Sequence, residues 1–422
     1  MKSLGLYLLT ATLFTLPLQA QFIKPAATTT AHLMNSLKER SYHRTQSLLN
    51  SYPIRNVGPV TMSGRVSDIA VHPDTSRIFY VGFGSAGIFK TTNGGTTMKP
   101  VFDNQGGAIG IGDIAISKSN PNILWAGTGE KNSSRSTYAG TGVYKTIDSG
   151  KTWNHMGLEG THHIGRILVH PNNPEIVWVG SMGALYSENS DRGVYKTVDG
   201  GQTWEKTLFV NEGTGVIDLI INPKNPKLLW AATWERSREA WNFVESGEGS
   251  AVYHSKDGGN TWEKVNNGLP TGRTLGRIGL SISAENPNRI YALIDNQDVR
   301  RVESENQAND GLKSDALWNM NSKDFLSLEN EEINQFLRQH GFPSKYTAEI
   351  VKKDISANIY PPSALADYIG DANAELFDTK IIGAEVYKTD NGGQSWEKTH
   401  QIALDNVYFT YGYYFGEIRV DP

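Results

Sequence analysis

One short phrase recurs along the chain and constrains its fold more than any other feature. It reads GVYKTVDGGQTWEK at residues 193–206, with close copies at 142–155, 251–264 and 385–398 and a divergent copy at 87–100. The copies follow one another at roughly 50 to 60 residues, except for a last interval of about 130 residues. A regular spacing of this length indicates a single repeat architecture built from similar units.

Each copy is preceded by two apolar runs with an Asn- and Pro-rich turn between them, as in HIGRILVHPNNPEIVWVG at residues 163–180. The phrase adds a third run, VYK, and a fourth that starts at its tryptophan. Four short strands in a period of roughly 50 residues are typical of a β-propeller blade. We name these strands A to D, from the propeller axis outward.

The phrase itself fits the hairpin turn between strands C and D. Its Asp or Asn side chain accepts hydrogen bonds from backbone N–H groups of the turn, and its glycines allow a positive φ. Its tryptophan then buries a large ring against the neighbouring blade. The sequence therefore predicts structural rather than catalytic roles for Asp148, Trp153, Asp199, Trp204, Asp257, Trp262, Asn391 and Trp396.

This phrase resembles the Asp-box, also called the bacterial neuraminidase repeat. The arrangement is similar to the bacterial Asp-box propellers grouped with the N-terminal domain of sortilin and with xyloglucanases, and residues 52–73 look like the opening of those bacterial members. The resemblance implies an all-β propeller of four-stranded blades with Asp-box turns. Because GEIRVDP at residues 416–422 matches the start of a strand A, we expect a truncated propeller whose remaining blades follow residue 422.

The domain organisation follows from these patterns. We predict a signal peptide at 1–20, a lead segment at 21–51, and an incomplete propeller of five blades and the start of a sixth at 52–422. A helical insertion is expected at 297–382, within the fifth blade, with helices at 327–340 and 363–373. It is either a cap over the mouth of the propeller or a decoration on its rim. The predicted location is secreted or periplasmic.

Composition narrows the possible partners. Lys and Arg number 40 and Asp and Glu 44, a balance that does not favour a nucleic-acid partner. No segment after the leader is apolar for long enough to span a membrane. The chain has no cysteine, so an exported form would depend on its core rather than on disulfides. No motif calls for a cofactor or a metal ion.

The connections between strands B and C are long and dissimilar, at residues 129–141, 181–192 and 233–250, and all fall on one face, the loop-rich face. Irregular loops on a rigid scaffold commonly carry binding residues. Aromatic, guanidinium and carboxylate groups there can stack on sugars or hold peptide ends. The alternative is ordinary loop packing. The predicted ligand-binding residues are Glu130, Arg135, Tyr138, Arg166, Trp234, Glu235, Arg236 and Trp241.

A second set of residues starts strand A in successive blades, where they would ring the central channel. Asp68, Asp113 and Asp218 belong to it, with Arg166 and Glu417 at equivalent positions. Neighbouring carboxylates could act as acid and base, because mutual repulsion raises one pKa. They could equally cap neighbouring turns. Asp68, Asp113 and Asp218 are the candidate catalytic residues.

Two functions fit this sequence. The first is an exported module that recognises a peptide or a glycan over its loop-rich face. The alternative is a glycoside hydrolase, xyloglucanase- or sialidase-like, that acts on extracellular polysaccharide. Xyloglucanases carry an Asp before strand C of the first blade, where this chain reads Gly84-Ser85-Ala86-Gly87. Whether the protein is an enzyme stays open at this point.

Overall fold

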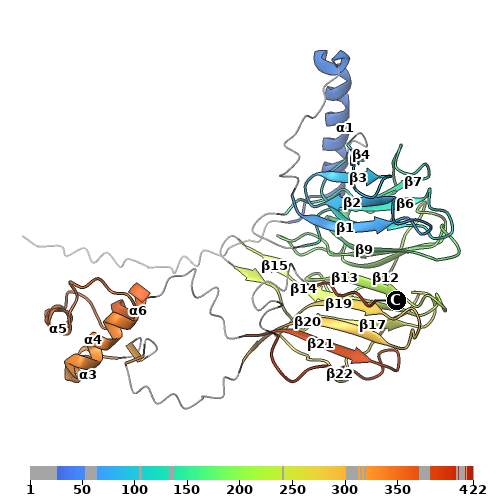
Figure 1. The fold of residues 1–422 in the computed structure, drawn as a ribbon. Coiled ribbons are helices and arrows are strands. Elements are labelled where there is room, and N and C mark those ends of the chain that lie inside the picture. Colours follow the sequence, from blue (N-terminus) through green and yellow to red (C-terminus); the bar gives the residue numbers. More distant parts are fainter. Residues whose placement is uncertain are drawn as a thin grey trace, which may run out of the picture.

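The computed structural model describes residues 26–52, 64–103, 107–132, 137–239, 242–300, 312–313, 316–317, 320–369, 381–404, 407, 414 and 416–421. The predicted signal peptide lies outside these residues. Figure 1 shows twisted sheets stacked in chain order, from blue near the N-terminus to red near the C-terminus. No helix among the described residues is long and apolar enough to cross a membrane.

Five four-stranded antiparallel sheets form the blades, and this confirms the predicted all-β propeller architecture. The first two blades contain β1 (Val66–Val71), β2 (Phe79–Phe83), β3 (Gly87–Thr91), β4 (Lys99–Pro100), β5 (Ile111–Ile116), β6 (Leu124–Thr128), β7 (Val143–Thr146) and β8 (Asn154–His155). The third contains β9 (Ile164–Val169), β10 (Val177–Ser181), β11 (Gly193–Thr197) and β12 (Glu205–Leu208).

The last two blades have the longest inner strands. They contain β13 (Thr214–Ile221), β14 (Leu229–Glu235), β17 (Ala251–Ser255), β18 (Glu263–Lys264), β19 (Leu275–Ile282), β20 (Ile290–Val299), β21 (Ile381–Thr389) and β22 (Glu397–Lys398). A small hairpin, β15 (Ser237–Arg238) with β16 (Phe243–Val244), lies in the connection between β14 and β17. The innermost strands β1, β5, β9, β13 and β19 contact one another in sequence.

The turn between β11 and β12 shows how the recurring phrase folds. The Thr203 N–H donates to Oδ1 of Asp199 at 3.0 Å, and the Thr203 and Thr197 hydroxyls donate to the same carboxylate at 2.6 and 2.7 Å. Gly201 donates its N–H to the Thr197 hydroxyl at 3.0 Å and has a φ of 93°. A side chain would be strained at that φ, so the glycine is required there.

The tryptophan after each turn contacts the preceding blade. The indole N–H groups of Trp153, Trp204 and Trp396 donate to the carbonyl groups of Val101, Met156 and Val265 at 2.7 to 2.9 Å, and Trp262 donates to the Thr207 hydroxyl at 3.2 Å. The first three tryptophans of the phrase are half-buried, while Trp396 is buried. Each ring therefore joins two blades.

A second row of aromatic residues, in strand B, was not predicted. Tyr80, Trp125, Trp178 and Trp230 are almost completely buried, each in the middle of its blade. The Trp178 and Trp230 N–H groups donate to the Gly258 and Gly392 carbonyl groups in the turn of the next blade, at 3.0 and 2.9 Å. Each pair of adjacent blades is thus joined by aromatic residues from both sides.

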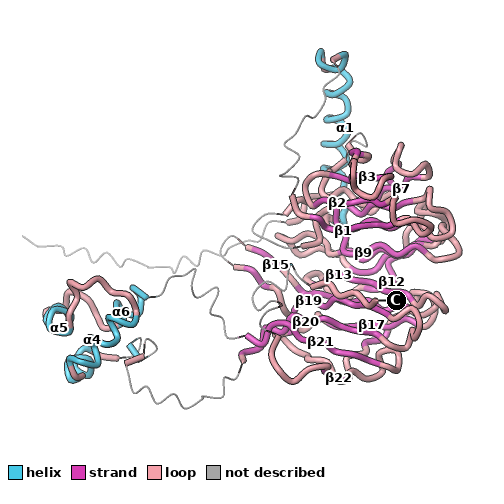
Figure 2. The backbone as a smooth tube through the Cα atoms, in the orientation of Figure 1, coloured by secondary structure: helices cyan, strands magenta, loops and turns pink. Residues whose placement is uncertain are grey.

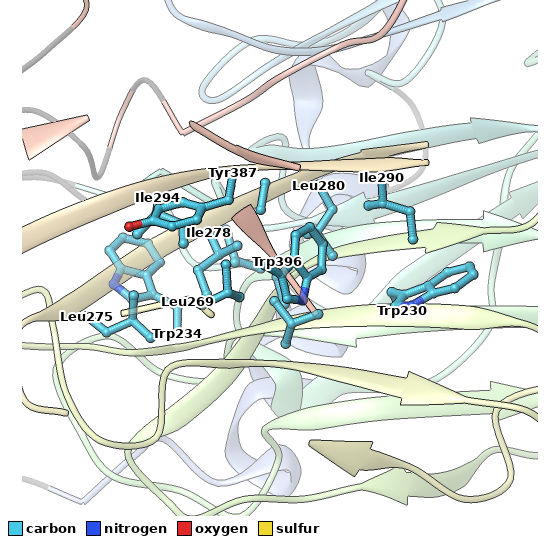
Figure 3. Packing of buried hydrophobic residues seen from close by; sticks show 14 of the residues in the cluster. Trp230, Trp234, Leu269, Leu275, Ile278, Leu280, Ile290, Ile294, Tyr387 and Trp396 are labelled. Atoms are coloured by element: carbon cyan, nitrogen blue, oxygen red, sulfur yellow. The ribbon is translucent and has the colours of Figure 1, made fainter. Parts of the chain in front are cut away.

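The largest apolar core lies between the fourth and fifth blades. Figure 3 shows Trp230 and Trp234 of β14 near Leu280 and Ile294 of the next blade, with Trp396 between them. The rings dominate this interface because an aromatic side chain buries more apolar area than an aliphatic one, on the order of 150–250 Å². Burial of such rings holds successive sheets together without disulfides.

Among the described residues, the longer helices lie before the first blade and between β20 and β21. α1 (Thr30–Gln46) projects from the sheets, has no buried residue, and is followed by the 3₁₀ turn η1 (Leu48–Ser51). A second 3₁₀ turn, η2 (Glu159–Thr161), precedes β9. Between β20 and β21 lie α3 (Ser322–Ser327), α4 (Asn330–Gln339), α5 (Ala348–Ser356) and α6 (Ser363–Ile369).

These last four helices pack on a core of their own, which includes Phe325, Phe336 and Val351 and no strand residue. The sequence predicted α4 and α6 but neither α3 nor α5. In Figures 1 and 2 the helical cluster lies apart from the sheets, at the left of the view. Whether it acts as a cap or as a rim decoration stays a prediction.

Candidate functional site

The inner-strand carboxylates bond to the backbone of the next blade. Asp68 accepts the N–H of Ile114 at 3.0 Å, Asp113 accepts that of Ile167 at 2.7 Å, and Asp218 accepts that of Leu280 at 2.9 Å. In each case the donor directly follows the equivalent position of the neighbouring inner strand. A carboxylate at the start of strand A therefore joins one blade to the next in three places.

Two cations complete this arrangement, which we call the axial cluster: Asp68, Asp113, Lys131, Arg166, Asp218 and Glu417. Arg166 donates to Asp218 at 2.8 Å and to Asp113 at 3.0 Å, and lies within 3.9 Å of Asp68 and 3.7 Å of Glu417. Lys131 Nζ lies 2.7 Å from Glu417 and 3.4 Å from Asp113. The cluster brings together four carboxylates. Asp68, Asp113 and Asp218 belong to the first, second and fourth blades, and Glu417 follows the fifth blade.

Electrostatics explain why these charges coexist. Burial opposes the charge of Arg166, but Asp218, Asp113, Glu417 and Asp68 outweigh that cost and raise its pKa well above its usual value. Burial raises the pKa of Asp113 to about 7, against the opposing influence of Arg166 and of Lys131. Every carboxylate of the axial cluster thus bonds to a backbone N–H group or to a cation, and these contacts fix its position. This favours the capping role over acid–base chemistry for Asp113 and Asp218.

A pocket of about 470 Å³ opens beside the axial cluster. Asp68 and Glu417 line it together with Asn132, Tyr414 and Arg419. The carboxylates of Asp68 and Glu417 are the most accessible of the cluster, with side chains 11% and 35% exposed. Of the three candidate catalytic residues, Asp68 alone lines this pocket.

The predicted ligand-binding loop residues divide into buried and accessible ones. Glu130 is fully buried, packs against Gly84 and forms a bidentate ion pair with Arg65 at 2.5 and 2.6 Å. Trp234 and Arg236 are also buried, with the guanidinium 5.1 Å from the ring centroid. Burial favours structural roles for these three side chains.

The other predicted residues differ. Tyr138 is half exposed, Glu235 lines a second pocket, and Arg166 belongs to the axial cluster. Arg135 and Trp241 lie outside the described residues. The structure thus places one of the predicted ligand-binding residues, Glu235, in a pocket wall of the loop-rich face.

An acidic pair, Asp295 and the half-buried Glu245, was not predicted. Asp295 on β20 is fully buried, and burial raises its pKa to about 7. Burial and the nearby Asp295 raise the pKa of Glu245 to about 8. One carboxyl oxygen of each has no hydrogen-bond partner among the described residues. An aspartate within the apolar run IYALID was the available signal, since charges are rare in the middle of a buried strand.

The described part of the chain contains no group of three His, Cys, Asp or Glu side chains arranged to hold a metal ion.

Parts of the chain are similar in sequence to known proteins. The family model described as sortilin, neurotensin receptor 3, matches residues 141–342. A xyloglucanase of Hypocrea jecorina is 32% identical over 147 residues, which cover 33% of this chain and 15% of that protein. A xyloglucanase of a Paenibacillus species is 26% identical over 247 residues, 52% of this chain and 23% of that protein.

Over part of its length the chain is thus similar to sortilin-type and xyloglucanase propellers. Among solved structures, it is also similar to a GH74 enzyme of Niastella koreensis, at 16% identity and a TM-score of 0.44, over 79% of this chain and 38% of that one. This propeller spans less than a third of the length of the curated xyloglucanases that it matches, between 15% and 28%. The relatives favour the alternative prediction, a glycoside hydrolase-like propeller, over the recognition module, which stays unconfirmed.

Proposed function

We propose that this chain forms, by itself or with further blades, an exported glycoside hydrolase-like propeller that takes an extracellular polysaccharide of the xyloglucan class across its loop-rich face. The observation that carries the proposal is the similarity of its blades to xyloglucanases from both fungal and bacterial sources. The pocket beside the axial cluster supports it, because carboxylate, amide and phenol groups there offer both donors and acceptors to sugar hydroxyls.

The carboxylates differ in what they can contribute to this function. Asp113 and Asp218 are held by the backbone of the next blade and by Arg166, so they fix the hub. Asp68 and Glu417 face the pocket and are the carboxylates that a bound sugar would meet. Hydrolysis needs two carboxyl groups on opposite sides of the scissile bond, about 5 to 9 Å apart. Asp68 and Glu417 are therefore the first pair to test.

The test uses the full-length protein and a panel of xyloglucan, mannan, pectin and a cellulose derivative. We expect retardation in a xyloglucan-containing gel and release of reducing ends, with hydrolysis reduced at least tenfold in Asp68→Asn. Glu205→Gln, an exposed change on β12, is the matched control. Neither binding nor hydrolysis of any polysaccharide would contradict the proposal, whereas binding without hydrolysis would leave a glycan-recognition module.

Peptide recognition is the second candidate, and the sortilin-type family match over residues 141–342 favours it. Its test is separate from the first. A random peptide library presented to the full-length protein would select a common motif if the loop-rich face binds peptides. A selection that yields no motif, together with glycan binding, would remove this candidate.

A further inference from the structure

A second pocket on the loop-rich face is larger than the one at the axis. It has a volume of about 710 Å³ and is lined by segments of the third, fourth and fifth blades, among them Asn211, Glu235, Ser246, Glu248 and Arg273. These residues come from the connections before β13, after β14 and before β19, which all emerge on the same face. We call this the side pocket.

The wall that carries Glu235 is built in a fixed shape. The Gly249 N–H donates to Oε2 of Glu235 at 2.8 Å, and the Glu235 N–H donates to the Ser250 hydroxyl at 3.1 Å. A side chain at Gly247 would overlap the Glu235 carboxyl, so the loop can wrap this group only with glycine there. The Gly247 N–H in turn donates to the carbonyl of Leu275 in the next blade at 3.1 Å. The acceptor is thus held ready before any ligand arrives.

The lining of the side pocket carries two carboxylates, Glu235 and Glu248, and one guanidinium, Arg273, and the buried Arg192 adds a second positive charge nearby. Glu248 pairs with Arg273 at 3.3 Å at the exposed edge. The buried guanidinium of Arg192 lies behind Glu235; burial lowers the pKa of Arg192 to about 10, against the influence of Glu188 and Glu235. A balanced pocket gives little preference to a cationic side chain. It suits a neutral ligand that both donates and accepts hydrogen bonds.

We propose that the side pocket binds one sugar ring of a neutral glycan chain, with the free oxygen of Glu235 accepting ring hydroxyls and Asn211, Ser246 and Arg273 completing the contacts. This proposal rests on the proposed function, because the subsite extends the polysaccharide path from the pocket beside the axial cluster toward the rim. Asn211 is already oriented for this role: its Oδ1 accepts the Gly213 N–H at 2.8 Å, which leaves its amide N–H groups to donate.

The experiment is a calorimetric titration of the full-length protein with a neutral xyloglucan oligosaccharide. Glu235→Gln keeps an oxygen for the Gly249 N–H but loses the charge, and we expect the affinity to fall about tenfold. Ser246→Trp fills the side pocket, removes no hydrogen bond of the described structure, and is expected to abolish binding at this subsite. Glu205→Gln should bind as the parent protein does. Thermal unfolding of each variant checks that the fold is kept, and Ser246→Trp preserves the test should Glu235→Gln unfold.

The outcomes separate the two proposals. If the parent protein binds no glycan, the proposed function itself fails. If the parent binds and both pocket variants bind equally well, the side pocket is not a subsite, although the proposed function stands. If a trilysine peptide binds in preference to the oligosaccharide, and Glu235→Gln abolishes that binding, the pocket is a cationic-peptide site and the sugar assignment is wrong.

Discussion

The two faces of the propeller are built on opposite plans. On the face of the recurring turns, the same few side chains appear in every blade, and each turn bonds to itself and to one neighbour. On the loop-rich face the connections differ in length, and charged groups such as Lys131, Arg236 and Asp295 are buried. Because the recurring turns join the blades on one face, the connections on the other face can differ and can hold buried charges. Ligand sites are commonly found among such loops and charges.

The largest expected effect comes from the hub of the loop-rich face. Replacing Arg166 by Met removes the guanidinium that pairs with Asp218 and Asp113 and leaves Lys131 as the cation beside Asp113. We expect a loss of about 3–5 kcal/mol in the free energy of unfolding. Urea denaturation of the full-length protein measures it. Arg289→Met is the matched control, since Arg289 also pairs with a carboxylate, Asp390 at 2.6 Å, but at the surface. Equal effects of the two substitutions would show that the axial cluster does not hold the blades together.

The next prediction concerns the acidic pair Asp295 and Glu245. Their carboxyl pKa values are raised to about 7 and about 8, whereas an unfolded chain has carboxyl pKa values near 4. At these two groups the folded state therefore binds more protons than the unfolded state between about pH 4 and pH 8, so the contribution of the pair to stability is highest at the acid end of this range and falls as the pH rises. Arg277 faces Asp295 and Arg238 faces Glu245, and both limit the fall.

Asp295→Asn removes the charge that forms at high pH. We expect the variant to gain roughly 1 to 3 kcal/mol relative to the parent at pH 8 and little at pH 5. Thermal unfolding across this range measures the difference. Asp74→Asn, at an exposed turn, is the control. A parallel shift of the whole pH profile would contradict the prediction, because it would reflect packing rather than titration.

The same comparison shows what a sequence can reveal. Five copies of one phrase predicted the blades and the order of their strands, because identical joints leave identical patterns. The inner carboxylates, Asp68 among them, were found from their register, but their partners were not, since Ile114 is distant in sequence and bonds through its backbone. Glu245 comes near Asp295 only through the way the long connection after β14 folds. No local pattern encodes that approach.

Two strand-B tryptophans provide a sharper comparison. Trp125 and Trp178 are both buried beneath a lysine, at 5.2 and 5.9 Å from the ring centroid. The Trp178 N–H donates to Gly258, whereas the equivalent carbonyl, of Gly200, accepts from Lys145 instead. The Trp125 N–H accordingly has no partner among the described residues.

Trp178→Phe should therefore cost more than Trp125→Phe, by about 1–2 kcal/mol in the free energy of unfolding. Both substitutions remove similar ring volume from the core, so the difference isolates the hydrogen bond and the cost of an unpaired buried N–H. Urea midpoints of the two variants, measured together, give this difference. Equal losses would indicate that a water molecule or an undescribed residue satisfies Trp125.

The smallest expected effect is in the recurring turns themselves. Asp148 accepts the Thr152 N–H at 2.9 Å, and Asn391 accepts the Ser395 N–H at 3.0 Å in the corresponding turn of the fifth blade. The chain therefore already uses an amide in this position, and Asp148→Asn should leave the urea midpoint at pH 7 unchanged.

A pH dependence tests the same point. Burial opposes the charge of Asp148, but the hydroxyl and N–H of Thr152 together with the Thr146 hydroxyl outweigh it and lower its pKa to about 2. A lowered carboxyl pKa contributes stability above about pH 4 that disappears as the pH falls toward 2, and the amide has no such term. Asp148→Asn should thus be slightly less sensitive to acid than the parent. A destabilisation at pH 7 as large as that of Trp178→Phe would mean that the turn needs a charge, and that the uniform face depends on electrostatics as strongly as the loop-rich one.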